Sequence, residues 1–159
     1  MNTFINILLV VAAFLFMEFM AWFTHKYVMH GFMWYFHKDH HIRDGRKVER
    51  NDIFAVIFAL PSMLLIYFGA VNPDSYLLSL GIGIMCYGLA YFMFHDVYVH
   101  QRIPILKNFS NRYLRATVKA HLEHHTPHVH YNYGFLLAPL RYYREEFGKK
   151  KFVQNSQAH

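Results

Sequence analysis

The sequence is short of cysteine and of charge. Cys86 is the single cysteine among 159 residues, so an internal disulfide, a CxxC redox motif and a cysteine-ligated iron–sulfur cluster are all excluded. Charged residues make up 16% of the chain, against about a quarter in soluble domains. Apolar and aromatic residues make up 55%. The composition therefore argues against a soluble globular protein, and any metal must be bound by nitrogen and oxygen atoms.

Three apolar runs are each long enough to cross a membrane. They cover residues 4–24, 53–71 and 76–94, and at about 1.5 Å per residue each spans roughly 30 Å, the thickness of the hydrocarbon core. They are apolar on all sides, whereas helices of a soluble bundle have polar faces. We predict one all-α domain over residues 1–159, an integral membrane bundle with three spans. A fourth span remains possible in the C-terminal third. The apolar stretch 131–140 is too short to cross the membrane, and we interpret it as a re-entrant or interfacial segment.

The basic residues predict the orientation of this bundle. All 16 lysines and arginines lie in two stretches, 26–50 and 102–151. The positive-inside rule places both stretches in the cytoplasm and the N-terminus outside. The first run lacks a basic n-region and a small-residue cleavage site, so we expect it to be retained as a span. Lipid headgroups account for the net charge of +6, and a nucleic-acid partner is unnecessary.

Histidine is in excess, with 13 residues, and most of them form a repeat. Each basic stretch contains the pattern HX4H followed by HX2HH. The ten histidines in the two copies are His25, His30, His37, His40, His41, His95, His100, His121, His124 and His125. Both copies begin where a span is expected to reach the cytoplasm, so the repeat predicts a metal-binding cap built from residues 25–52 and 95–151.

The spacing of the histidines indicates two metals. On an α-helix the three imidazoles of HX2HH project from one face. Those of HX4H lie roughly 140° apart, and we expect them to serve different metals unless the helix ends or bulges between them. Ten imidazoles exceed what a structural zinc site needs, and haem uses single facing histidines. The pattern favours an oxygen-activating di-iron centre, with a non-catalytic metal- or haem-binding membrane protein as the alternative.

Four segments of the chain resemble the bacterial β-carotene 3-hydroxylases, histidine-rich membrane proteins of the fatty acid hydroxylase superfamily. They are HKYVMHG at 25–31, NDIFAV at 51–56, YFMFHDVYVHQR at 91–102 and YGFLLAP at 133–139. The resemblance runs from about Met17 to Pro139 and includes all four histidine boxes. It implies a non-haem di-iron monooxygenase that hydroxylates C3 of the β-ionone ring and converts β-carotene through β-cryptoxanthin to zeaxanthin.

The resemblance also implies cofactors and partners. These are two iron ions, O₂ as co-substrate, electrons from ferredoxin and its NAD(P)H-dependent reductase, and a carotenoid drawn from the bilayer of the bacterial cytoplasmic membrane. Zinc can occupy such imidazole sites in purified protein. A carotenoid ketolase and a lipid or fatty acid hydroxylase are the related alternatives. Basic side chains are available to dock an acidic ferredoxin, namely Lys107, Arg112, Arg115, Lys119 and Lys149–Lys151.

Five further residues are candidates for the surroundings of the metals. Asp39 and Asp96 adjoin histidine boxes, where a carboxylate can accept the second N–H of a ligating imidazole. Glu18, two helical turns before His25, belongs either to the outer shell or substrate passage or to a hydrogen bond between helices. His128 and His130 lie where the chain departs from the family pattern. An additional ligand role is open for them, but Pro127 favours a polar loop.

Overall fold

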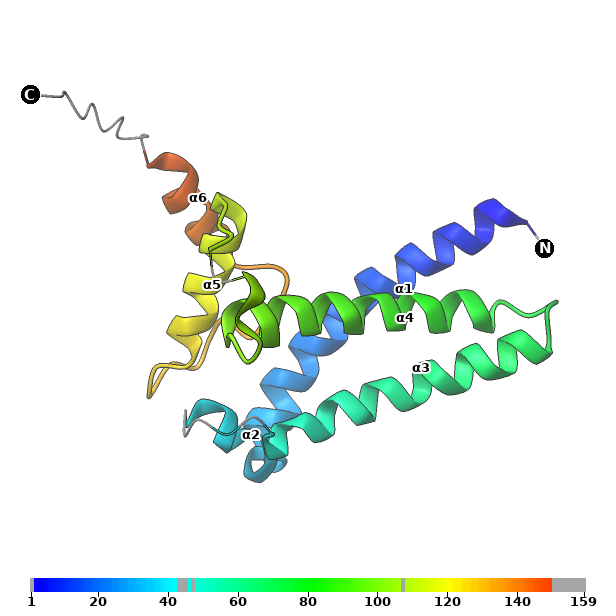
Figure 1. The fold of residues 1–159 in the computed structure, drawn as a ribbon, viewed down its shortest axis with the longest axis horizontal. Coiled ribbons are helices and arrows are strands. Elements are labelled where there is room, and N and C mark those ends of the chain that lie inside the picture. The colour runs from blue at the N-terminus through cyan, green and yellow to red at the C-terminus, as the bar shows by residue number, and fades with distance from the viewer. Residues whose placement is uncertain (1, 43–45, 47, 107, 150–159) are drawn as a thin grey trace, which may run out of the picture.

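Three long helices dominate the structure, a computed structural model that describes residues 2–42, 46, 48–106 and 108–149 (Figure 1). They are α1 (Thr3–Phe23), α3 (Ile53–Val71) and α4 (Leu77–Phe92), and all regular elements in the described residues are helical. With the turns that continue them, the segments long and apolar enough to cross a membrane are Thr3–Phe32, Arg50–Val71 and Leu77–Val99. The predicted all-α fold with three candidate spans is confirmed.

The outward faces of these helices are apolar. Leu15 on α1 is 62% exposed, and on α3 Leu60 and Tyr67 are 56% and 62% exposed. Such exposure over whole helices would be unfavourable in water, but hydrocarbon solvates these side chains. The exposed surface therefore fits a bundle that is surrounded by lipid.

Helix α4 packs against both α1 and α3. Small residues permit this close approach, as is common between membrane helices. A Cβ added to Gly83 would lie 2.5 Å from the carbonyl oxygen of Val10 on α1. On the other side of α4, the Ser62 hydroxyl donates a hydrogen bond to the Gly81 carbonyl at 2.8 Å. Helices α1, α3 and α4 thus form one closely packed membrane unit.

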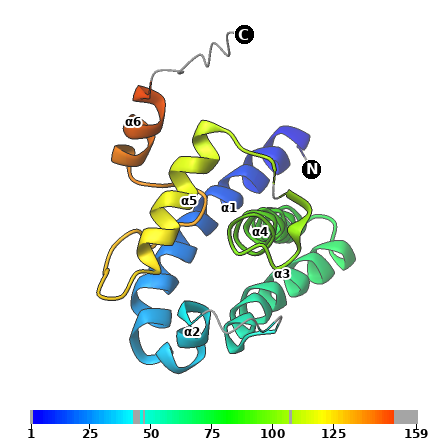
Figure 2. The same cartoon turned by 60° about the vertical axis from the view of Figure 1, so that its left-hand side comes forward.

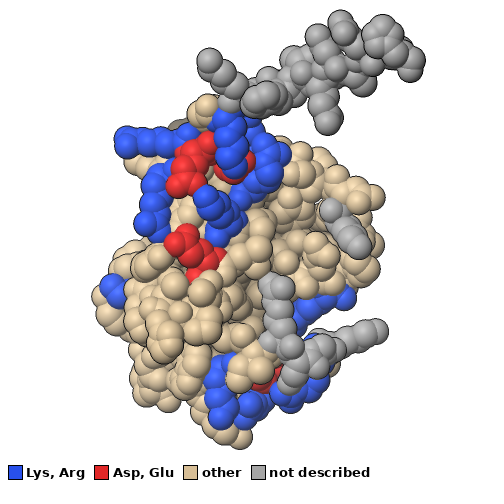
Figure 3. Space-filling view, turned by 90° about the vertical axis from the view of Figure 1, so that its left-hand side faces the viewer, with Lys and Arg blue, Asp and Glu red and all other residues tan. Residues whose placement is uncertain are grey.

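The remaining helices form a cap at one end of this unit (Figures 1 and 2). They are α2 (Trp34–His41), α5 (Arg112–His124) and α6 (Leu140–Gly148), with α5 packed on α6, and the short 3₁₀ turns η2 (Arg50–Asp52) and η4 (Pro104–Leu106). The start of α1 and the α3–α4 turn lie at the opposite end (Figure 1). Lysine and arginine side chains gather on the face of the cap (Figure 3). This gathering of lysine and arginine at one end of the bundle is the asymmetry from which the positive-inside rule predicts orientation.

The stretch interpreted as re-entrant or interfacial is an irregular segment, without helix between Val129 and Pro139. It is held against α1, because the Glu18 carboxylate accepts hydrogen bonds from the backbone N–H groups of Leu136 and Leu137 at 3.1 and 3.0 Å. Within the described residues the C-terminal third therefore contributes a packed loop and no fourth span.

Candidate metal centre

Both HX4H motifs coincide with π-helical turns, η1 (Thr24–Phe32) after α1 and η3 (Met93–Val99) after α4, and His100 is the residue directly after η3. A π-helix joins residues five apart by hydrogen bonds; the N–H of His100, for example, donates to the carbonyl of His95 at 2.9 Å. The ring centroids are 5.0 Å apart for His25 and His30 and 4.5 Å apart for His95 and His100. Each helix bulges between the two histidines of its motif. The expectation that these two histidines serve different metals assumed an ideal α-helix, so it does not apply here.

Nine of the ten histidines of the repeat converge into two neighbouring groups. In each group, ligand-type nitrogen atoms lie within 4.8 Å of one another. The first cluster is His25, His30, His37, His41 and His124, and the second is His40, His95, His100 and His121. His125 adjoins the second cluster, with its Nε2 2.9 Å from Nε2 of His121. It also stacks on His41 of the first cluster at 4.3 Å between centroids, so the two clusters touch.

The two copies of the repeat exchange one histidine. The middle histidine of the first HX2HH box, His40, belongs to the second cluster, and its counterpart His124 belongs to the first. Nε2 of His124 lies 3.1 Å from Nε2 of His25, and Nε2 of His40 lies 3.0 Å from Nε2 of His95. Neither cluster can therefore form from one copy alone.

The first cluster fits a metal ion because its nitrogen lone pairs face one another. Nδ1 of His25 is 3.0 Å from the carbonyl oxygen of Tyr133, and Nδ1 of His37 is 2.7 Å from Oδ1 of Asn51. These oxygens only accept, so each Nδ1 carries the proton and each Nε2 presents a lone pair. The two Nε2 atoms are 3.1 Å apart. At this distance their lone pairs repel each other. A metal ion bound between the two nitrogen atoms would remove the repulsion, because both lone pairs would ligate it.

In the second cluster too, the Nδ1 atoms face acceptor oxygens, and here these oxygens belong to carboxylates. Nδ1 of His40 donates to Glu49 at 2.9 Å, and Nδ1 of His95 faces Asp96 at 3.3 Å. The lone pairs on the two Nε2 atoms again point at each other. Imidazole ligands without thiolate suit divalent iron, zinc, copper or nickel. The residues present thus fit a pair of adjacent transition-metal ions.

Burial favours the neutral form of three of these imidazoles, those of His37, His40 and His41, and the neutral form is the one that binds metals. It lowers the pKa of His41 to about 3, and the neighbouring His37 and His124 add to this effect. Burial also lowers the pKa of His37 to about 3, although the hydrogen bond to Asn51 acts in the opposite direction. The pKa of His40 falls well below its ordinary value through burial and the proximity of His95.

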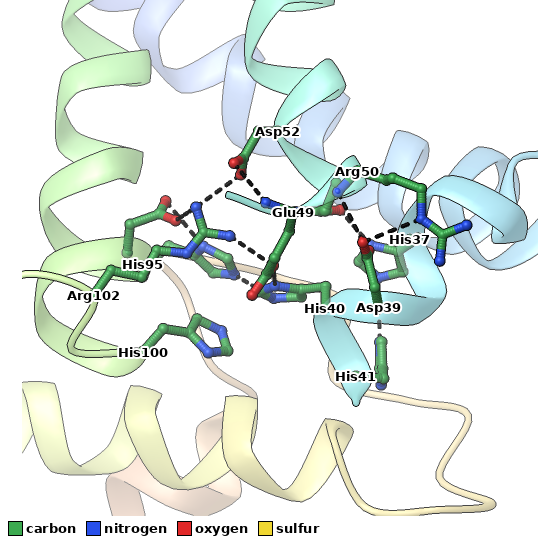
Figure 4. A network of polar contacts seen from close by, with 12 residues as sticks. His37, Asp39, His40, His41, Glu49, Arg50, Asp52, His95, His100 and Arg102 are labelled. Atoms are coloured by element: carbon green, nitrogen blue, oxygen red, sulfur yellow. Dashed lines mark hydrogen bonds and ion pairs between the residues drawn. The ribbon is translucent and has the colours of Figure 1, made fainter. Parts of the chain in front are cut away.

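Three residues around the two clusters have no counterpart in the sequence prediction. Glu49 accepts from His40, and the guanidinium of Arg102 lies 2.6 Å from the same carboxylate (Figure 4). Asn51 accepts from His37. The only signal for Glu49 and Asn51 in the sequence is a polar run, Glu49 to Asp52, directly before an apolar span. Such runs usually mark a solvated helix start, so the pattern did not single these residues out.

The carboxylates predicted from sequence have different surroundings. Asp96 lies against His95. Asp39 instead accepts hydrogen bonds from the backbone N–H of Arg50 at 2.8 Å and from its Nε at 3.3 Å. Asp39 therefore connects α2 to η2. Glu18 accepts from the Tyr87 hydroxyl at 2.8 Å as well as from the loop amides, which is the internal hydrogen-bonding alternative.

His128 and His130 lie outside both groups of converging nitrogens in the described residues. Both follow Pro127 in the irregular segment after α5, and His128 has a positive φ of 69°. The polar-loop interpretation agrees with this placement. The last histidine, His159, falls outside the described residues, as do Lys107, Lys150 and Lys151 of the predicted docking surface.

An apolar cavity of about 320 Å³ lies between α1, α3 and α4, and two aromatic residues of its wall contact the histidines. Its walls include Met17, Phe58, Gly88, Tyr91 and Phe135. The Tyr91 ring stacks on His95 at 4.7 Å between centroids, and the Phe135 ring stacks on His25 at 4.8 Å. Phe135 is also 5.5 Å from His95. The cavity wall thus touches one histidine of each cluster.

Comparisons with known proteins give the family. The model of the fatty acid hydroxylase family matches residues 10–140. The chain belongs to this family. A beta-carotene hydroxylase from Pantoea ananas is 41% identical over 137 residues, which cover 84% of this chain and 78% of the relative. A beta-carotene hydroxylase from Pseudescherichia vulneris is 40% identical over 121 residues, 76% of this chain and 68% of the relative.

A plant relative is less similar to this chain. The chloroplastic beta-carotene 3-hydroxylase 2 of Arabidopsis thaliana is 34% identical over 142 residues, which cover 87% of this chain and 46% of the plant protein. The shared region therefore covers most of this chain but less than half of the plant protein. The comparison with solved structures finds no significant match.

Proposed function

We propose that this chain is a carotenoid β-ring 3-hydroxylase, a single membrane-embedded domain that converts β-carotene through β-cryptoxanthin to zeaxanthin. The observation that carries the proposal is the apolar cavity, whose wall residues Tyr91 and Phe135 touch histidines of both clusters. The relatives at about 40% identity, which are beta-carotene hydroxylases, support the choice of substrate.

The cavity suits a hydrocarbon that arrives from the bilayer. Its lining from the three spans is almost entirely apolar, so a β-ionone ring can enter without desolvating polar groups. Phe135 and Tyr91 supply flat aromatic surfaces beside the histidines. They orient the ring and exclude water, so that one ring carbon faces the metal centre. The polyene chain remains in the lipid.

The ten histidines of the repeat are the proposed metal ligands, divided between the two clusters as their contacts divide them. Two bound iron ions would supply the chemistry that reduces O₂ with two electrons and two protons. One oxygen atom is added to the ring carbon, and the other leaves as water. The chain's own contribution is to hold the ligands. Glu49, Asn51, Asp96 and the carbonyl of Tyr133 fix the rings of four histidines in the ligating tautomer.

The electrons come from an acidic ferredoxin and its reductase in this proposal. Arg112, Arg115 and Lys119 on α5 lie at the cap, where basic side chains gather (Figure 3). The groove lined by Arg115 and Lys119 also contains His100 of the second cluster. A reduced partner docked there by charge would lie close to a ligand of the metal centre.

Expression in cells that accumulate β-carotene tests the function. Pigment chromatography should detect β-cryptoxanthin and zeaxanthin when ferredoxin and its reductase are present. His41→Ala should abolish product, while the matched variant His128→Ala should retain it. Keto-carotenoids in place of hydroxylated ones would indicate a ketolase. Unchanged β-carotene despite folded, iron-loaded protein would contradict the proposal.

A further inference from the structure

The groups that orient the imidazole rings differ between the two clusters. In the first cluster they are neutral acceptors, the carbonyl of Tyr133 for His25 and the side-chain amide of Asn51 for His37. In the second cluster they are carboxylates, Glu49 for His40 and Asp96 for His95. An imidazole that donates to a carboxylate is a more basic ligand than one that donates to a neutral oxygen.

Arg102 links these two carboxylates, and Figure 4 shows it beside Glu49 and Asp52. Its guanidinium nitrogens lie 2.6 Å from Glu49, 3.1 Å from Asp96 and 2.7 Å from Asp52. The Arg102 side chain is 17% exposed, so solvent screens the network only weakly. Three carboxylates face one guanidinium, which leaves two formal negative charges beside the second cluster.

The backbone directs Arg102 into this position. Gln101 has a positive φ of 53° and turns the chain sharply after η3. The N–H of Arg102 then donates to the carbonyl of Asp96 at 2.9 Å. Because the arginine is fixed by its own backbone, it can hold Glu49 and Asp96 toward the histidines.

We propose that the second cluster holds its metal ion more tightly than the first, and that Arg102 is the positioning residue behind this difference. Both clusters contain five imidazoles when His125 is counted with the second, so ligand number does not separate them. The negative charge and the carboxylate-bound rings favour a divalent cation at the second cluster. This inference rests on the proposed two-metal centre, but not on the identity of the substrate.

Release of metal from the full-length protein tests the inference. Protein loaded with two Fe²⁺ per chain is placed in excess chelator without oxygen, and bound iron is measured over time. We expect two phases that differ at least tenfold in rate. Glu49→Gln, which keeps the side-chain shape, and Arg102→Gln should accelerate the slow phase by about 10- to 100-fold, the range typical of groups that orient metal ligands. Arg102→Lys should restore part of the slow phase.

Matched variants assign the phases to the clusters. Arg50→Gln is the control for arginine loss, since Arg50 pairs with Asp39, and it should leave both rates unchanged. His41→Ala should remove the fast phase and His100→Ala the slow one. Asn51→Asp, which gives His37 a carboxylate partner, should slow the fast phase.

Three outcomes would overturn the inference. The first is release of both ions in one phase from the unmodified protein. The second is a slow phase that Glu49→Gln and Arg102→Gln both leave unchanged. The third is loss of the slow phase in His41→Ala in place of His100→Ala. Failure to load two ions per chain would contradict the two-metal centre itself, which is a separate result from an altered order of release.

Discussion

Glu18 accepts a hydrogen bond at 3.2 Å from the backbone N–H of Phe135, 117 residues further along the chain. The carboxylate belongs to the first membrane-spanning helix, and the phenyl ring of Phe135 belongs to the cavity wall and stacks on His25. Glu18 therefore fixes, through the loop backbone, the aromatic ring that separates the cavity from the histidines. A costly carboxylate within an apolar span has a structural reason here.

Removal of this carboxylate should loosen the loop. In Glu18→Ala the N–H groups of Phe135, which is buried, and of Leu136, which is half-buried, lose their acceptor, and an unsatisfied buried N–H costs about 1–3 kcal/mol. We expect a lower unfolding temperature and strongly reduced hydroxylation, with a milder effect in Glu18→Gln. Circular dichroism during heating of detergent-solubilised protein measures the first quantity. Glu145→Gln, an exposed residue paired with Lys119, is the control, and equal behaviour of the two variants would refute this role of Glu18.

The cavity should be sensitive to added volume at Gly88. A Cβ built at this glycine meets no atom within 4 Å, and the residue lines the cavity. Gly88→Leu should therefore fill part of the space and reduce product formation at least tenfold, while iron content and unfolding temperature remain near normal. Product chromatography and metal analysis of the same preparation check this. Full activity in Gly88→Leu would show that the substrate ring does not use the cavity.

Gly83 lies on the same helix as Gly88, but it has no space for a side chain. An added Cβ would lie 2.5 Å from the carbonyl oxygen of Val10 and 2.6 Å from the Cβ of Ala13. Gly83→Ala should force α1 and α4 apart and destabilise the protein by about 1–3 kcal/mol, as overpacking does in other cores. The measurement is again the unfolding temperature in detergent. A stable Gly83→Ala protein would contradict the close approach of the two helices.

The spans could be predicted from sequence because a helix that faces lipid on most of its surface must be apolar all round. The ten histidines could be singled out because they repeat in the same order. Their division could not be predicted. The π-helical turns pair His25 with His30 in a way that α-helical geometry does not allow, and the exchange of His40 and His124 depends on how distant segments pack.

The ion pair of Arg102 with Glu49 could not be predicted from the sequence either, because it too depends on the packing of distant segments. Glu49 and Arg102 are 53 residues apart in numbering, and their ion pair joins the residue directly before η2 to the turn that follows η3. No local periodicity reports such a contact. Asp39 and Asp96 both adjoin histidine boxes in sequence, but Asp39 accepts from Arg50 whereas Asp96 lies against His95, so proximity along the chain did not distinguish their partners.

The exchange of histidines between the clusters has a measurable consequence. His124→Ala removes a nitrogen from the first cluster although it lies in the second copy of the repeat. We expect its iron content and product yield to fall in the same way as those of His41→Ala, with turnover reduced by orders of magnitude. His130→Ala, from the loop, should keep both quantities near normal. Loss of iron in His130→Ala at normal protein level would place the loop after Pro127 in the site.

The last prediction concerns the orientation of the bundle in the membrane. The cap carries the basic side chains and the histidines, whereas the start of α1 and the α3–α4 turn lie at the far end (Figure 1). The positive-inside rule then places the cap in the cytoplasm. A reporter active only in the cytoplasm should work when fused after Lys151 and fail when fused before Met1, and a reporter active only outside should behave in the opposite way. Protein level, measured for every fusion, excludes degradation as the cause of a silent reporter. Cytoplasmic activity at both ends would require an even number of spans and would contradict the three-span topology.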